Sequence, residues 1–420
     1  MPTSRPTKVL LPAAAAAALG LVLAGCAAQP ASDSSEITLT LSTFGNFGYS
    51  DELLAKYEAE HPGIKIVHNV AANGTDARTN LFTKLAAGSG LADVEAIEIG
   101  WTVDLRQYAD MFVPVPEDQA DEWVDFQTAP VTTDDGELFA YGVATGPEAI
   151  CYRSDLLEAA GLPGDPASVA QSLTGDWDDY FAAGEAYVAG GGGPWFDSAY
   201  TVYNAQIEQM GFPYEDEDDN IVADNPDVER VFRDTLAGAP QLSAGLTSFS
   251  EDWAAAMGNG GFATMACPSW MLGIIEGNSQ GVTAWNVADA FPGGGGNWGG
   301  SFLAVPVQSP HPEEAAELAA WLTAPEQQIE AFTVAGPFPS RLAAFDLPEL
   351  KEITNPFFND APVGEIFTER STAIDMIVYK GPKYFQIDQA AKDAIARVEA
   401  GTQSIDDAWA QFVSDAEDLK

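Results

Sequence analysis

The sequence predicts an exported α/β protein built from two lobes. Segments with β-type alternation and segments with helical spacing follow one another through the first hundred residues, which favours an α/β fold. The chain has 420 residues, more than one hydrophobic core usually supports, so two lobes are expected. A cationic start followed by a short apolar run has the form of a secretory signal peptide.

The N-terminal segment predicts where the mature chain begins. Arg5 and Lys8 precede an apolar run over residues 9–23, which is too short and too rich in alanine to favour a permanent membrane span. The letters LAGC that end at Cys26 resemble the bacterial lipobox, which implies cleavage before Cys26 and lipid on its sulfur. The alternative is an ordinary signal peptide with an incidental cysteine. We therefore expect a signal peptide over residues 1–25 and a flexible tether over residues 26–36, since the tether is small and polar.

The first folded segments predict a mainly parallel sheet. Residues 37–41 alternate apolar and polar, and residues 51–61 carry Leu53, Leu54 and Tyr57 at helical spacing before Pro62 and Gly63 end the helix. The next expected elements are a strand over 64–67, a helix over 79–87 and a strand over 94–99. This alternation is typical of an α/β lobe with parallel strands.

Later segments are richer in helices. The expected helices cover residues 177–188, 200–210, 227–236, 312–322, 386–399 and 405–419, and residues 302–307 form an apolar strand. Glycine runs at 190–193 and 293–296 interrupt the pattern. The acidic run at 215–220 lacks the glycine and terminal glutamate of an EF-hand loop, so a solvated turn between two short strands is expected rather than a calcium site.

Charge excludes several functions. The full chain has 18 basic and 63 acidic side chains, and removal of Arg5 and Lys8 with the signal peptide leaves a net charge of −47. Such a surface repels nucleic acid and anionic lipid headgroups, so no nucleic-acid partner is expected and the membrane is reached through the lipid anchor alone. The three histidines lie singly in separate segments, and neither a metal nor a cofactor is expected.

The cysteine count predicts one disulfide. Lipid on Cys26 leaves Cys151 and Cys267 as an even pair in a compartment that permits disulfides. We expect these two residues to be bonded, and two buried free thiols are the alternative. A loop of this length would contribute about 4–5 kcal/mol in the chain-entropy model.

Five segments in order along the chain carry a family resemblance. They are EAEHPGIKI at 58–66, YRSDLLEAAGLP at 152–163, GGFATMACPSW at 260–270, PEEAA at 312–316 with WLTAPEQ at 321–327, and GPFPSR at 336–341. Their succession resembles the extracellular solute-binding proteins of ABC sugar importers, family 1, which are related to maltose-binding protein. Cys151 and Cys267 with the letters PSW at 268–270 look similar to actinobacterial cello-oligosaccharide binders.

The resemblance implies a fold and partners. The implied fold is the periplasmic-binding-protein type II fold, in which two α/β lobes joined by hinge crossings enclose a ligand cleft. Lobe one is expected at 36–145 plus 298–345, and lobe two at 146–297 plus 346–420. The implied partners are a carbohydrate and the permease subunits of an importer with its cytoplasmic ATPase, and we expect a monomer on the outer face of the cytoplasmic membrane. One departure stands out, because Thr145, Gly146 and Pro147 occupy the place of a carboxylate in maltose-binding protein, with Glu148 displaced.

Ligand contacts are expected from aromatic side chains beside amides and carboxylates, because rings cover the flat faces of a sugar and polar groups bind its hydroxyls. Trp270 matches the family's stacking position. The other candidates follow expected strands or glycine runs; the full set is Phe44, Asn46, Phe47, Trp101, Asp104, Trp195, Trp270, Asn297, Trp298 and Tyr379. For the two phenylalanines the alternative is packing inside the lobe, and for Trp270 a place in the core or at the rim.

The expected function is capture of a neutral carbohydrate, favoured as an oligosaccharide of the cello or malto type, and its delivery to a permease. No reaction is required. An exported glycan hydrolase with paired carboxylates is the alternative, although 63 acidic residues make such pairs inevitable. A binder of a non-sugar solute on the same fold is a third possibility.

Overall fold

The computed structural model describes residues 36–420. The signal peptide predicted at 1–25, the lipid site predicted at Cys26 and nearly all of the tether predicted at 26–36 lie outside the described residues. Within the described range, no helix combines the length and apolarity needed to cross a bilayer.

The first elements form a parallel arrangement, as predicted. Strands β1 (Ile37–Phe44), β2 (Ile64–Ala71) and β3 (Val94–Glu98) alternate with helices α1 (Asp51–Glu60) and α2 (Gly74–Ala87), and β1 pairs with β2 and β3 in parallel. Ser50 caps α1 by accepting a hydrogen bond from the N–H of Leu53. Helix α2 begins five residues before its predicted start because Asn73 caps it, and it ends at Gly88 in the left-handed conformation.

The sheet as a whole is mixed, so the prediction of a mainly parallel sheet holds only for its first three strands. The strand order is β2-β1-β3-β7-β4-β5, and β6 (Trp285–Ala288) and β8 (Phe338–Pro339) also pair with β4. Strand β7 (Asn297–Ala304) is antiparallel to both β3 and β4. Strand β7 comes from a distant part of the chain, so the local alternation of strand and helix in the first hundred residues does not extend to its pairings.

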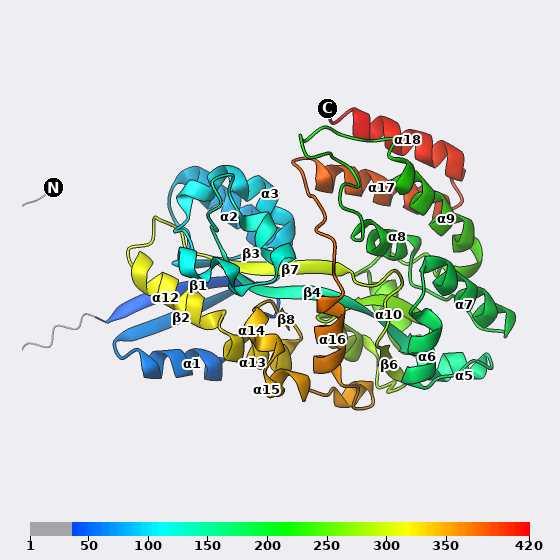
Figure 1. The fold of residues 1–420 in the computed structure, drawn as a ribbon, viewed down its shortest axis with the longest axis horizontal. Helices are drawn as coiled ribbons and strands as arrows, with labels where there is room; N and C mark the ends of the chain where they lie inside the picture. The colour runs from blue at the N-terminus through cyan, green and yellow to red at the C-terminus, as the bar shows by residue number, and fades with distance from the viewer. Residues whose placement is uncertain (1–35) are drawn as a thin grey trace, which may run out of the picture. The chain divides into compact units, whose positions relative to one another are not determined.

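Strand β4 (Tyr141–Arg153) is long, and all of its residues are buried. Its first half pairs with β7 and β8, and its second half pairs with β5 (Thr264–Pro268) and β6. Figure 1 shows β4 and β7 running alongside each other. The register shifts around Pro147, in keeping with the rule that proline within a sheet lies at an edge or a bulge.

The disulfide between Cys151 and Cys267 is present, which confirms that prediction. It joins β4 to β5, and both cysteines are fully buried.

The remaining helices cover much of the chain after β3. Their bounds are α3 (Thr102–Leu105), α4 (Asp125–Thr128), α5 (Ser154–Ala159), α6 (Pro166–Leu173), α7 (Trp177–Ala189), α8 (Ala199–Ile207), α9 (Pro226–Leu242), α10 (Glu251–Asn259), α11 (Met271–Asn278), α12 (Pro312–Leu322), α13 (Pro325–Ala335), α14 (Leu342–Phe345), α15 (Pro348–Lys351), α16 (Val363–Thr372), α17 (Tyr384–Glu399) and α18 (Ile405–Glu417). The acidic run forms a turn closed by a single bridge between Glu215 and Ile221 rather than by two short strands. The Asp216 side chain closes the turn by accepting hydrogen bonds from the backbone N–H groups of Asp218 and Asn220.

Three hydrophobic clusters fill the interior. One draws on residues from 39 to 144 and from 302 to 331, the second on 150–291 and 384–416, and the third on residues between 124 and 367. The third cluster contains both cysteines and residues from each side of the expected boundary near 145. The division into two discontinuous lobes therefore stays a prediction.

Candidate ligand-binding site

The first half of β7 forms the frame of the candidate site. Ser301 of β7 pairs with Glu98 at the end of β3, and Asn297 pairs with Pro147 of β4. The N–H of Glu148 donates to the carbonyl of Gly296 at 3.0 Å. Two carboxylates, from β3 and β4, therefore flank the segment of β7 that carries Trp298.

Three aromatic rings gather beside this frame, and we call them the tryptophan group: Trp270, Trp298 and Phe249. The ring centroids of Trp270 and Trp298 lie 5.4 Å apart, and the Trp270 indole N–H donates to the Trp298 carbonyl at 2.9 Å. Phe249 lies 6.4 Å from Trp270 with nearly parallel rings. Both tryptophans are half-buried and Phe249 is 59% exposed, so the group presents ring surface to solvent.

The Asn297 side chain forms hydrogen bonds with the backbone of two neighbouring segments. Its side-chain oxygen accepts from the N–H of Gly146 at 2.9 Å, and its amide nitrogen donates to the carbonyl of Gly299 at 2.9 Å. Asn297 is 9% exposed. Its amide thus holds β7 against β4 at the place where the sequence predicted a ligand contact.

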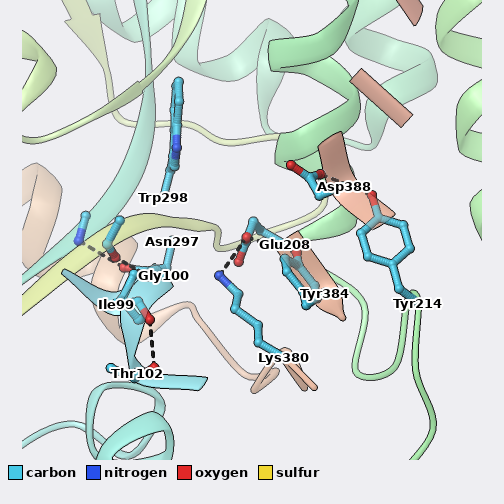
Figure 2. Close-up of polar contacts among 12 residues, drawn as sticks. Ile99, Gly100, Thr102, Glu208, Tyr214, Asn297, Trp298, Lys380, Tyr384 and Asp388 are labelled. Atoms are coloured by element: carbon cyan, nitrogen blue, oxygen red, sulfur yellow. Dashed lines mark hydrogen bonds and ion pairs between the residues drawn. The ribbon is translucent and has the colours of Figure 1, made fainter. Parts of the chain in front are cut away.

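A group of charged side chains lies next to the frame, and we call it the carboxylate group: Glu98, Glu148, Glu208 and Lys380. Figure 2 shows Lys380 reaching Glu208, with Tyr384 beside them. The Lys380 ammonium lies 2.9 Å from Glu208, and the Tyr384 hydroxyl donates to the same carboxylate at 3.2 Å. Glu98 accepts from the N–H of Gly100 at 2.7 Å.

Burial dominates the electrostatics of this group. It raises the pKa of Glu98 to about 7, with Lys380 acting in the opposite direction and Glu208 reinforcing the rise. It also raises the pKa of Glu148 well above the usual value, and Glu208 again reinforces the rise. The charges of Glu208 and Lys380 therefore act on both Glu98 and Glu148.

A second aromatic group follows β1 and β3. Phe44 lies 5.0 Å from Phe47 and 4.9 Å from Trp101, centroid to centroid. Phe47 and Trp101 are 7% and 6% exposed and belong to a hydrophobic cluster, so the packing alternative describes them better than an open ligand surface does. Phe44 is half-buried at the edge of this group.

The other predicted residues lie apart. Asn46 is exposed and its side chain accepts from the N–H of Gly48, and Asp104 pairs with Arg78 at 2.5 Å. Tyr379 contacts the Phe212 ring and donates to Asp219. Trp195 is 1% exposed in the core, where its ring packs against those of Tyr180 and Tyr187. Trp195 belongs to a hydrophobic cluster, and the expectation of ligand contact there is corrected to core packing.

Sequence reasoning missed several members of the site. It did not single out Phe249, Glu98, Glu208 or Lys380, and it noted Glu148 only as a displaced carboxylate. Phe249 is an isolated aromatic side chain among small polar residues with a backbone φ of 66°, which is rare for a bulky residue. A lone aromatic residue within the polar stretch TSFSED at 247–252 is the sequence signal that could have identified it.

Comparison with known proteins places the chain in a family. Residues 52–358 match the family described as bacterial extracellular solute-binding protein. The arabinooligosaccharide-binding protein of Bacillus subtilis (strain 168) is 26% identical over 358 residues, which cover 80% of each chain. A solved structure described as extracellular solute-binding protein family 1 is 44% identical, with a TM-score of 0.84 and coverage of 91% of this chain and 99% of that one.

The fold agrees with this relationship. Maltose-bound MalE3 of T. maritima, at 19% identity, has a TM-score of 0.70 over 91% of this chain and 100% of its own. The chain therefore belongs to the bacterial extracellular solute-binding protein family, with the fold of periplasmic binding proteins. It is the solute-binding component of an ABC transporter, and its family is one of binding proteins rather than enzymes.

Proposed function

We propose that the chain is the lipid-anchored receptor of an ABC importer for a short oligosaccharide. The observation that carries the proposal is that β7 carries Trp298, whose ring contacts Trp270, and runs between the strands that supply Glu98 and Glu148. Stacking rings and hydrogen-bonding carboxylates are the two kinds of surface that a sugar requires.

Sugar units would stack on the tryptophan group, in which the Trp270 and Trp298 rings stand at 71° to each other and would cover different faces. Its hydroxyls would donate to the carboxylate group, and Lys380 would donate to a sugar oxygen. Phe44, Asn46 and Asp104 belong to the opposite wall in this proposal, with Phe47 and Trp101 packed behind it, and Tyr379 belongs to the rim. The proposed lobes are 36–145 plus 298–345 and 146–297 plus 346–420.

Negatively charged sugars fit poorly. The mature chain carries a net charge of −47, and three carboxylates gather at the site against one lysine. Gluco-oligosaccharides of two or three units, of the cello or malto type, are our first candidates. Arabino-oligosaccharides are the next, because a relative that is 26% identical is described as binding them.

Transport requires that the ligand favour a closed arrangement of the lobes. A ligand shifts a conformational equilibrium only by its differential affinity for the two states. Hinge closure around the sugar would generate the form that the permease recognises, and the cytoplasmic ATPase would drive release.

Replacement of Trp270 by alanine tests the site. The change removes a stacking face, and we expect the affinity for the bound oligosaccharide to fall at least tenfold in isothermal titration calorimetry of the mature chain. A calorimetric screen of cello-, malto- and arabino-oligosaccharides identifies that ligand before the variants are compared. Trp321→Ala is the matched control, because Trp321 contacts Tyr57 and Glu60 away from β7.

Two results would count against the proposal. Unchanged affinity in Trp270→Ala would mean that Trp270 is not at the centre of the binding site. Release of shorter sugars during incubation would identify a hydrolase, whereas binding without product supports a receptor.

A further inference from the structure

The carboxylate group has an excess of acid. Its three carboxylates come from β3, β4 and the end of α8, and Lys380 is the basic side chain that faces them. Lys380 already donates to Glu208. Arg78 also acts on Glu98, but its guanidinium is paired with Asp104 at the surface. The positive charge of Lys380 therefore stands against three carboxylates.

Glu148 is the unsatisfied member. Its side chain is fully buried, and neither carboxylate oxygen accepts a hydrogen bond from a described residue. The carboxylate lies against Gly296, where a Cβ atom would stand 2.8 Å from Oε2, and it faces Glu208 and Lys380. A buried acid without a donor is costly, so its retention beside a ligand site points to a donor on the ligand.

The chemistry of that donor can be narrowed. Among residues 36–420 no group of three or more acidic, histidine or cysteine side chains has the arrangement of a metal site. A hydroxyl would supply one hydrogen bond but no charge. An ammonium supplies three hydrogen-bond donors, which the Glu148 oxygens lack. It also supplies a positive charge, which offsets the excess of carboxylates.

We propose that the ligand carries a basic amine which the carboxylate group binds, so that the receptor prefers an oligosaccharide containing an amino sugar. This inference rests on the proposed function. The amine binds Glu148, while Lys380 remains on Glu208, and the sugar stacks on the tryptophan group.

The protonation states make this preference dependent on pH. Burial raises the pKa of Glu148 well above its usual value and that of Glu98 to about 7. A bound ammonium favours the ionised form of Glu148, so binding expels the Glu148 proton at a pH below its raised pKa, and the affinity falls as the pH drops further. Glu208, Lys380 and Arg78 are the other charged groups that act on these two acids.

A pair of trisaccharides with the same linkage isolates the amine. Cellotriose and the β-1,4-linked trisaccharide of glucosamine differ by hydroxyl against amine at C2. In titration calorimetry of the mature chain at pH 7.5, we expect the glucosamine trisaccharide to bind at least tenfold more tightly. The preference should shrink to less than threefold in Glu148→Gln and should also diminish at pH 5.5.

The control is Glu352→Gln, which removes one charge at an exposed position and should keep the full preference. Thermal melting of Glu148→Gln verifies that the variant is folded. Equal or tighter binding of cellotriose by the wild-type chain overturns the inference while the proposed function stands. Failure of every sugar to bind overturns both.

Discussion

At the scale of single residues, Gly146 determines how closely β4 approaches the tryptophan group. A Cβ at this position would lie 2.0 Å from the carbonyl oxygen of Trp298 and 2.9 Å from the indole nitrogen of Trp270. We expect Gly146→Ala to lower the free energy of unfolding by about 1–3 kcal/mol, since neither contact can relax without moving the strand or the ring. Urea unfolding followed by tryptophan fluorescence measures the change.

Gly193→Ala is the matched control, because a Cβ there meets nothing within 4 Å and its φ is not left-handed. It should change stability by less than about 0.5 kcal/mol. Equal stability of Gly146→Ala and the wild-type chain would mean that β4 and β7 lie further apart than described.

The sequence predicted part of the candidate site, because Trp270 and Trp298 are aromatic residues that also stand where a strand or a glycine run predicts a loop. Trp270 follows an apolar segment, and Trp298 follows a glycine run. The two rings do contact each other. Trp195 also follows a glycine run, yet the backbone of its neighbour Phe196 bridges both Ser243 and Thr264 and draws the ring into the core. The carboxylate group escaped prediction because its members come from four distant segments that only the fold brings together.

At the scale of elements, the bond between Cys151 and Cys267 stabilises the junction of β4 and β5. The two cysteines are 116 residues apart, so the bond restricts a long loop in the unfolded chain. We expect Cys151→Ala with Cys267→Ala to reduce the free energy of unfolding by about 2–5 kcal/mol. Thermal and urea unfolding of the oxidised wild-type and the double variant measure the loss.

Reduction with a thiol under native conditions provides the control. Both cysteines are fully buried, so the bond should resist reduction until the chain unfolds. Identical unfolding curves for the double variant and the oxidised wild-type chain would contradict a stabilising role.

Local signals explain which elements were predictable. Helix α12 spans the predicted residues, since Pro312 opens it and its apolar residues recur at helical spacing. Strand β4 went unrecognised because Gly142, Gly146 and Pro147 break the alternation that marks a strand. Its pairing with β5, β6, β7 and β8 overrides that local weakness. Antiparallel pairing between distant segments leaves no local pattern, so the mixed sheet could not be predicted.

At the scale of the whole molecule, function depends on where the receptor is held. A composition of small polar residues predicts that residues 27–36 form a flexible coil, which would span about 17 Å. Lipid on Cys26 would then keep the binding site beside the permease and raise its effective concentration there. Two acyl chains anchor a protein stably, whereas a net charge of −47 offers no other attraction to an anionic membrane.

Replacement of Cys26 by alanine tests this arrangement. The variant should move from the membrane fraction to the culture medium, because the cysteine that would carry the lipid is gone, and its sugar affinity should match that of the wild-type chain. Immunoblots of the two fractions and calorimetry of the released protein measure both outcomes. Cys151→Ala with Cys267→Ala should remain with the membrane, since neither cysteine lies in the lipobox. Retention of Cys26→Ala at the membrane would show that something other than lipid on this cysteine holds the receptor in place.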